Sequence, residues 1–217
     1  MTQVHDALPL GDSAITIKFG ADKSPALLRQ IHTTAAHLRG QRLPHVEDIV
    51  PAYLAITVFY DSLAASYEEI KAVLVAAIET GEVAELAELP VREHVIAVRY
   101  DGPDLEHVAQ RCRLTVDDVI TIHSAGTYTV DLLGFVPGFA YLSEVDARIQ
   151  IPRRAEPRTR VPAGSVAIAG AHTGIYPLDT PGGWHVLGST AIRMFDVTRE
   201  PPALFAAGDV VRFERVG

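Results

Sequence analysis

The spacing of glycine and proline in the C-terminal half of the chain constrains the fold more than any other sequence feature. From Tyr128 to Val216 the sequence consists of short apolar runs, each interrupted by Gly or Pro. Helices need longer uninterrupted stretches, whereas strands of about four to eight residues fit between such turns. The spacing therefore predicts a β-barrel or a β-sandwich over this region.

The first ~90 residues alternate instead between strand and helix patterns. Strands are predicted over Ala14–Phe19, Val46–Val50 and Leu54–Tyr60, and helices over Ser24–Arg39 and Ser66–Thr80. The first helix should have Ser24 as its N-cap, Pro25 at its first position and Gly40 as its stop. The order strand, helix, strand, strand, helix predicts a compact α+β unit of ferredoxin-like type.

An acidic stretch that ends in proline, Gly81–Pro90, is predicted to link two domains. We therefore expect an N-terminal α/β domain over residues 1–88 and a second domain over residues 89–217. His94–Tyr100 reads as a strand that opens the second domain, and His94 itself is expected to be structural.

Two short helices are expected between that strand and the β-rich region. Pro103–Cys112 is predicted to begin with Pro103 at its first helical position. Thr115–Ser124 begins with Thr115, and Asp118 follows three residues later, which is the pattern of a capping box.

Composition excludes several classes of protein. The formal net charge of −8 argues against a general nucleic-acid binder, which needs clustered Lys and Arg. Cys112 is the only cysteine, so neither an intrachain disulfide nor a thiolate zinc site is expected. The longest apolar run, Ile49–Tyr60, is too short to span a bilayer, and the N-terminus lacks a signal-peptide pattern. We expect a soluble, cytoplasmic protein.

The segment Gly134–Gly188 combines three features that suit a small-molecule site. Prolines stiffen it, glycines allow the backbone to approach a ligand closely, and aromatic side chains offer apolar walls. The aromatics are Phe135, Phe139, Tyr141, Tyr176 and Trp184. Turns between barrel strands and aromatic packing in the core would explain the same composition.

Four arginines lie within eight residues of this segment, at Arg153, Arg154, Arg158 and Arg160. Guanidinium groups bind carboxylates and phosphates, bidentately where the geometry permits. A local basic cluster in an acidic chain therefore predicts an anion site.

Seven stretches spread over nearly the whole chain match one known family. They are GDSAITIKFG (11–20), EDIVPAYLAITVFYD (47–61), YDGPDLEHVA (100–109), GFVPGFAYL (134–142), PRRAEPRTRVPAGSVAIAG (152–170), TGIYPLDTPGGWHVLG (173–188) and GDVVRF (208–213). Together they resemble the family that includes the B subunit of 5-oxoprolinase, the sensor-kinase inhibitor KipI and allophanate hydrolase subunit 1. One departure is His172, where many relatives carry glutamine.

The resemblance implies a small N-terminal α/β domain followed by a cyclophilin-like β-barrel that carries the family motifs. It also implies two partners of 5-oxoprolinase type, a KipA-like C subunit and a LamB/YcsF-type A subunit. The favoured activity is ATP-dependent opening of 5-oxoproline to L-glutamate by a hydrolase in which this chain is inactive alone. Phosphorylation of the lactam oxygen would activate a poor electrophile, and the developing negative charge requires fixed cations and amide donors.

ATP with magnesium is the expected cofactor. The chain lacks a Walker-type GxxxxGK[ST] motif, so the nucleotide site is expected to be shared with a partner. No set of His, Asp and Glu has convincing metal-ligand spacing, and no resident metal is predicted.

His123 and Asp131 are the candidate catalytic residues. His123 falls at the end of a predicted helix, where the helix dipole would stabilise its protonated form, and a capping or packing role is the alternative. Asp131 precedes GFVPGF and could be a base, a magnesium ligand or a turn residue. Asp179 is expected to be a turn residue and Cys112 a packing residue. The candidate binding residues besides the four arginines are Tyr176, Gly182, Gly183, Trp184 and His185.

Two other functions stay open. The chain could be allophanate hydrolase subunit 1 or a urea-carboxylase-type carboxyltransferase component, because the family motifs are shared. In another class, it could be a KipI-like inhibitor that docks on a sensor histidine kinase. A peptidyl-prolyl isomerase is a weaker alternative, because a barrel fold alone does not transfer activity.

Overall fold

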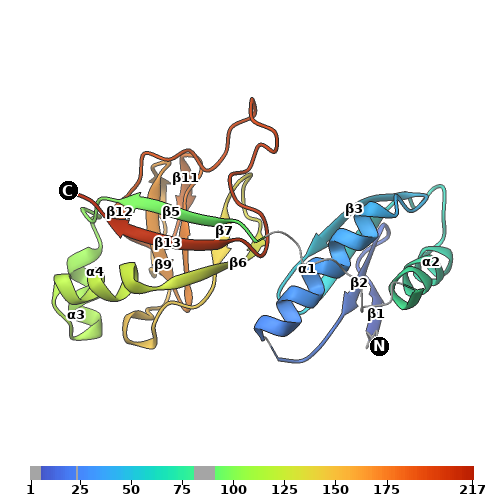
Figure 1. Ribbon diagram of the computed structural model, residues 1–217, viewed down its shortest axis with the longest axis horizontal. Helices are drawn as coiled ribbons and strands as arrows, with labels where there is room; N and C mark the ends of the chain where they lie inside the picture. The colour runs from blue at the N-terminus through green and yellow to red at the C-terminus, as the bar shows by residue number, and fades with distance from the viewer. Residues whose placement is uncertain (1–5, 23, 81–90) are drawn as a thin grey trace. The chain divides into compact units, whose positions relative to one another are not determined.

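The computed structural model describes residues 6–22, 24–80 and 91–217, and the chain divides into two compact units between Pro90 and Val91 (Figure 1). The predicted linker Gly81–Pro90 lies outside the described residues. The elements of the first unit are β1 Asp6–Pro9, β2 Ala14–Lys18, α1 Pro25–Gly40, β3 Val46–Pro51, β4 Ala55–Tyr60 and α2 Tyr67–Thr80.

The first unit is an antiparallel sheet of order β1-β2-β4-β3 with helices α1 and α2. Strand β4 lies between β2 and β3, which α1 connects, so this is a split β-α-β arrangement. Apolar residues alternate along the strands, and Ile15, Ile17, Ile56 and Val58 are fully buried with residues from both helices. The strands and helices predicted from the sequence are present in the predicted order.

Strand β1 is an addition that the sequence analysis does not predict. It pairs with β2 at the edge of the sheet. Its four residues include a proline and are mostly exposed, so neither alternation nor β-propensity marks it. The predicted cap of α1 is confirmed, because the Ser24 hydroxyl accepts a hydrogen bond from the Leu27 amide at 3.1 Å.

The second unit contains most of the β-structure. Its elements are β5 Glu93–Val98, α3 Leu105–Cys112, α4 Val116–Ala125, β6 Thr127–Leu133, β7 Ala140–Leu142, the 3-10 turn η1 Ala147–Ile149, β8 Arg158–Val161, β9 Ser165–Ala169, β10 His172–Ile175, β11 Thr180–Gly182, β12 His185–Ser189 and β13 Val210–Arg215. Seven of the strands form one sheet of order β12-β9-β10-β7-β6-β13-β5, and β8 pairs with β11.

The seven-stranded sheet is nearly closed into a barrel. Its edge strands β5 and β12 meet just beyond Val98, where Arg99 and Ser189 exchange two backbone hydrogen bonds of 2.9 and 2.8 Å. Gly188 makes this approach possible, because a Cβ there would lie 2.3 Å from the Arg99 carbonyl oxygen. The sequence expectation of a β-barrel or sandwich is thus met by a barrel-like sheet.

Two apolar clusters cover opposite faces of this sheet. Strand β9 illustrates the division, because Val166 and Ile168 belong to one cluster and Ala167 and Ala169 to the other. The first cluster includes residues of α3 and α4, and α4 packs on β13. The second is aromatic and lies beside the loop that precedes β7.

The predicted start of helix α3 is wrong by two residues. The first helical position is Leu105 and not Pro103. Asp104 precedes it, and the Asp104 carboxylate does not cap the helix because it binds elsewhere. The predicted capping box of α4 is confirmed. The Thr115 hydroxyl accepts from the Asp118 amide, and the Asp118 carboxylate accepts from the Thr115 amide.

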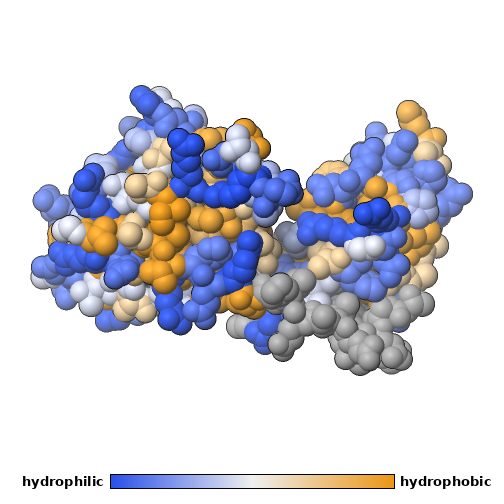
Figure 2. Space-filling model, turned by 45° about the horizontal axis from the view of Figure 1, so that its top comes forward, coloured by the Kyte–Doolittle hydropathy of each residue, from blue (hydrophilic) through white to orange (hydrophobic). Residues whose placement is uncertain are grey.

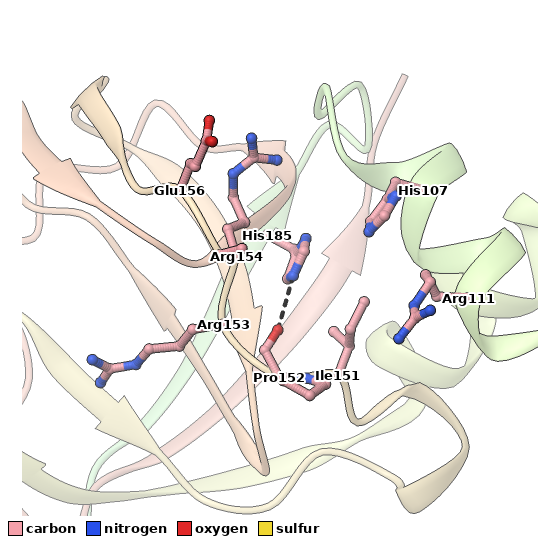
Figure 3. Close-up of a pocket in the computed structure, with 9 residues that line it drawn as sticks. His107, Arg111, Ile151, Pro152, Arg153, Arg154, Glu156 and His185 are labelled. Carbon is pink, nitrogen blue, oxygen red and sulfur yellow. Dashed lines mark hydrogen bonds between the residues drawn. The ribbon is translucent and has the colours of Figure 1, made fainter.

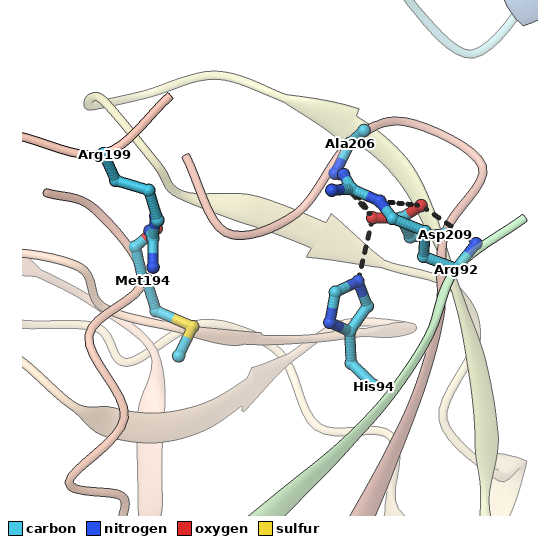
Figure 4. A network of polar contacts seen from close by, with 6 residues as sticks. All are labelled: Arg92, His94, Met194, Arg199, Ala206 and Asp209. Atoms are coloured by element: carbon cyan, nitrogen blue, oxygen red, sulfur yellow. Dashed lines mark hydrogen bonds and ion pairs between the residues drawn. The ribbon is translucent and has the colours of Figure 1, made fainter. Parts of the chain in front are cut away.

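A buried carboxylate fastens the first strand of this unit to its last (Figure 4). Asp209 lies just before β13 and is 2% exposed. Its Oδ2 accepts from Arg92 Nη2 at 3.1 Å, from His94 Nε2 at 3.0 Å and from the Ala206 amide at 2.8 Å. His94 therefore has the structural role that its position suggests.

The surface in view in Figure 2 shows apolar side chains in separate groups among hydrophilic ones. No helix within the described ranges is long and apolar enough to cross a bilayer.

Candidate functional site

Two of the four clustered arginines bind a carboxylate inside the fold rather than an open anion site. Arg158 approaches Asp104 bidentately, with Nη1–Oδ2 and Nη2–Oδ1 distances of 2.8 Å, and Arg154 Nη1 adds a third bond of 2.8 Å. The Val186 amide donates a fourth, at 2.7 Å. Asp104 is 3% exposed, and burial alone would raise its pKa. The hydrogen bonds from Arg158 and Val186 and both guanidinium charges outweigh burial and lower the pKa.

The other two arginines lie apart from this network. Arg160 forms an exposed ion pair with Asp179, with Nε–Oδ2 at 2.9 Å. Asp179 also accepts from the Ala163 amide at 2.8 Å, and this bond, with the Arg160 contact, lowers its pKa. Arg153 forms no ion pair with any residue that the structure describes. The predicted cluster of four is therefore divided among three environments.

A cavity of about 430 Å³ opens between helix α3 and the segment that follows η1 (Figure 3). Its floor is formed by the apolar residues Ile151 and Pro152. Its charged and titratable lining consists of His107, Arg111, Arg153, Arg154, Glu156 and His185. Arg154 is already paired with Asp104. Arg111 and Arg153 form no ion pair with a described residue and outnumber the one carboxylate of the lining, Glu156, so the lining favours an anion.

Helix α3 contributes two residues that sequence reasoning missed. His107 and Arg111 are four residues apart and so lie on one face of the helix, toward the cavity. The His107 ring stacks on the His185 ring, with centroids 5.3 Å apart and planes 14° from parallel. The i, i+4 spacing was the available signal, but nothing local in the sequence indicates what faces it.

His185 is fixed by one hydrogen bond. Its Nε2 lies 2.9 Å from the Pro152 carbonyl oxygen, so Nε2 carries the proton and donates. Burial, the largest effect, lowers the pKa of His185, and the ring is neutral at pH 7. Nδ1 therefore presents a lone pair, and it has no hydrogen-bond partner among the described residues.

His123 is a fully buried core histidine, and the prediction that helix α4 stabilises its protonated form is wrong. The Thr173 hydroxyl donates to the Ala167 carbonyl oxygen, so it accepts from His123 Nε2 at 2.8 Å. His123 Nδ1 then accepts from the Tyr100 hydroxyl, also at 2.8 Å. Burial lowers the pKa of His123 to about 3, because a charged ring would lose its water and gain no carboxylate.

Asp131 lies on the other face of the sheet, beside the residue that departs from the family pattern. His172 and Thr173 are consecutive on β10 and point to opposite faces. Thr173 contacts His123, whereas His172 Nδ1 lies 3.9 Å from the fully buried Asp131 carboxylate. The two predicted catalytic residues are thus separated by the sheet, and neither lines the cavity.

Three aromatic residues of the predicted site, Phe139, Tyr176 and Trp184, form a core rather than an open wall, whereas Phe135 is 60% exposed. Tyr176 and Trp184 are 2% and 5% exposed, and Phe139 packs edge-on against both. A Cβ on Gly182 would lie 2.3 Å from the Tyr176 hydroxyl oxygen, so this glycine is required by packing. The Gly183 carbonyl accepts from the Arg154 amide at 2.8 Å and fixes the cavity segment.

Of the predicted site residues, the cavity brings together Arg153, Arg154 and His185. It is not lined by His123, Asp131, Arg158, Arg160, Tyr176, Gly182, Gly183 or Trp184. Across the described part of the chain, no three His, Cys, Asp or Glu side chains are placed to hold a metal ion. Cys112 is half-buried against the helical core, and burial raises its pKa.

Known proteins resemble this chain in sequence and in fold. The carboxyltransferase domain family, subdomains C and D, matches residues 5–205. The B subunit of 5-oxoprolinase from Bacillus subtilis strain 168 is 39% identical over 229 residues, which cover 100% of this chain and 95% of the relative.

Two solved structures extend the comparison. The crystal structure of TTHA0988 is 38% identical with a TM-score of 0.82, and the match covers 94% of this chain and 40% of that longer one. The K. lactis urea amidolyase matches with a TM-score of 0.76 over 97% of this chain and 15% of its own. At 16% identity, this second likeness is one of fold alone.

Proposed function

Because the chain belongs to the family of carboxyltransferase domains with subdomains C and D, and is similar over its full length to the B subunit of a 5-oxoprolinase, we propose that it serves as the B subunit of such an enzyme. The single observation that carries the proposal is the 39% identity across 100% of this chain. The cation-lined cavity supports it, because 5-oxoproline is a small carboxylate.

The enzyme that we propose couples ATP hydrolysis to lactam opening and needs a KipA-like and a LamB/YcsF-type subunit in the cytoplasm. A ferredoxin-like first unit and a cyclophilin-like barrel belong to the same proposal. The split β-α-β order of the first sheet and the nearly closed second sheet support that description.

The residues of this chain fit a nucleotide only in part. Arg111, Arg153 and Arg154 are suitable donors to phosphate oxygens. Trp184 and Tyr176 are buried and offer no face for an adenine ring, and the described residues provide no cluster of three carboxylates for magnesium. We therefore assign most of the nucleotide site to a partner.

The test is reconstitution from purified subunits with a panel of substrates. Glutamate formation from 5-oxoproline and ATP is measured with and without this chain, and allophanate and urea are supplied in parallel. ATP-coupled glutamate formation that requires this chain is the expected result. Activity toward 5-oxoproline that is the same when the chain is omitted would contradict the proposal.

The family also favours a second candidate, a carboxyltransferase component, because the family is named for a carboxyltransferase domain. We take the urea-carboxylase type as the form to test. Carboxylation of urea needs a carboxyl donor, so bicarbonate is added with ATP throughout the panel. This candidate then predicts turnover of urea or allophanate and no glutamate from 5-oxoproline. The same panel therefore separates the two functions.

A further inference from the structure

Two buried polar atoms at the cavity wall have no hydrogen-bond partner among the described residues. They are His185 Nδ1, in a side chain 3% exposed, and Arg154 Nε. The first is an acceptor, because Nε2 holds the ring proton, and the second is a donor. A buried polar atom without a hydrogen-bond partner is costly, so both atoms favour a ligand that pairs them.

An amide can pair with one acceptor and one donor. Its carbonyl oxygen accepts from a guanidinium N–H, and its N–H donates to an imidazole lone pair. Both protein atoms belong to residues whose positions are fixed, Arg154 by Asp104 and His185 by Pro152. These two residues are therefore held in place before a ligand arrives.

A charged group in the same cavity lining adds a second requirement. Arg111 is exposed, lines the same cavity and forms no ion pair with a described residue. Glu156 is the acidic member of the lining and opposes an anion. His107 stacks on His185 and makes no hydrogen bond with a described residue, so its ring can turn aside at little cost.

We propose that this cavity binds a small carboxylate that also carries an amide or lactam group. His185 Nδ1 accepts the amide N–H, Arg154 Nε donates to the amide oxygen, and Arg111 pairs with the carboxylate. This inference rests on the proposed function, since 5-oxoproline is such a molecule, and it assigns the substrate subsite to residues of this chain.

The test measures equilibrium binding of L-5-oxoproline to the full chain and to the chain assembled with its partners, without ATP. His185→Gln keeps a donor to the Pro152 carbonyl but removes the Nδ1 acceptor, whereas His185→Asn places an oxygen near the Nδ1 position. The first should weaken binding about tenfold, and the second should restore part of the loss. Trp184 fluorescence verifies folding of each variant.

Ligand analogues turn this into a double-mutant cycle. N-methyl-5-oxoproline lacks the N–H and should bind the wild type about tenfold more weakly than 5-oxoproline does. Its affinity should not fall further when His185 is replaced by Gln. The carboxamide of 5-oxoproline should bind the wild type more weakly than 5-oxoproline does. The Arg111→Gln substitution should weaken its binding little further. Arg212→Gln, which removes an exposed arginine of the same unit, is the charge control and should leave binding unchanged.

Nitrogen NMR gives an independent readout, because a hydrogen bond to Nδ1 moves the His185 Nδ1 resonance and leaves that of Nε2 in place. The inference would be overturned by additive losses of affinity in the cycle or by an unmoved Nδ1 resonance. It would also be overturned if inorganic phosphate bound as tightly as 5-oxoproline, or if neither preparation bound 5-oxoproline. If omission of the chain stops glutamate formation while His185→Gln and Arg111→Gln leave KM unchanged, the proposed function stands and this subsite falls. If omission has no effect but the cycle is non-additive, the subsite stands and the proposed function falls.

Discussion

The buried histidine of helix α4 should make the second unit sensitive to acid in a defined range. His123 is neutral in the folded chain, with a pKa of about 3, against an ordinary value of 6.5. The unfolded chain therefore takes up a proton as the pH falls below 6.5, while the folded chain does not until about pH 3. Stability is complete above pH 6.5 and is lost progressively as the pH falls toward about 3.

The magnitude follows from the width of that range. Between pH 7 and pH 4.5, a depressed histidine pKa costs about 3 kcal/mol of unfolding free energy, at about 1.4 kcal/mol per pH unit below 6.5. His123→Gln removes this titration and can keep one of the two hydrogen bonds. The variant should be less stable than the wild type at pH 7 but lose about 3 kcal/mol less on acidification.

Urea unfolding followed by Trp184 fluorescence is the appropriate assay. The chain has one tryptophan, which lies in the same unit as His123, so the signal reports on that unit rather than on the whole chain. Other groups titrate over the same range in both proteins and cancel in the difference. Equal losses in the two proteins, or an NMR titration of His123 near pH 6.5, would refute the reasoning.

Two further predictions concern stability, read by the same unfolding assay. Asp104→Asn should cost about 3 kcal/mol, because two partly buried guanidinium groups lose their counter-charge, while Asp101→Asn on the exposed surface should cost less than about 1 kcal/mol. A loss at position 104 no larger than the loss at position 101 would show that the buried network contributes nothing. Gly188→Ala should cost about 3 kcal/mol, because its Cβ would lie 2.3 Å from the Arg99 carbonyl oxygen, while Gly134→Ala makes only ordinary contacts and should stay within about 1 kcal/mol. Equal stability of the two alanine variants would argue against the close approach of the barrel edges.

Local sequence patterns predict most of the elements because they depend on neighbours in the chain. The cap at Ser24 and the capping box at Thr115 each lie within four residues and are confirmed. Gly and Pro spacing likewise predicts the short strands of the second unit. Strand β1 escapes prediction because its conformation comes from pairing with β2 and not from its own residues.

The candidate site is predicted less well because it depends on contacts between distant parts of the chain. Arg154 and Arg158 are conspicuous in the sequence, but their partner Asp104 lies 50 and 54 residues away, inside the helix predicted over Pro103–Cys112. His107 and Arg111 share a helix face, yet only the fold brings that face to His185. A carboxylate that ends up buried gives no local signal, so the division of the arginines could not be foreseen.

The measurement that tests the central claim most directly is glutamate formation from 5-oxoproline and ATP by the purified subunits, with this chain present, omitted, or replaced by Arg111→Gln. The account predicts turnover with the wild-type chain, none without it, and a raised KM for 5-oxoproline with the variant. Turnover that continues unchanged when the chain is omitted would contradict it.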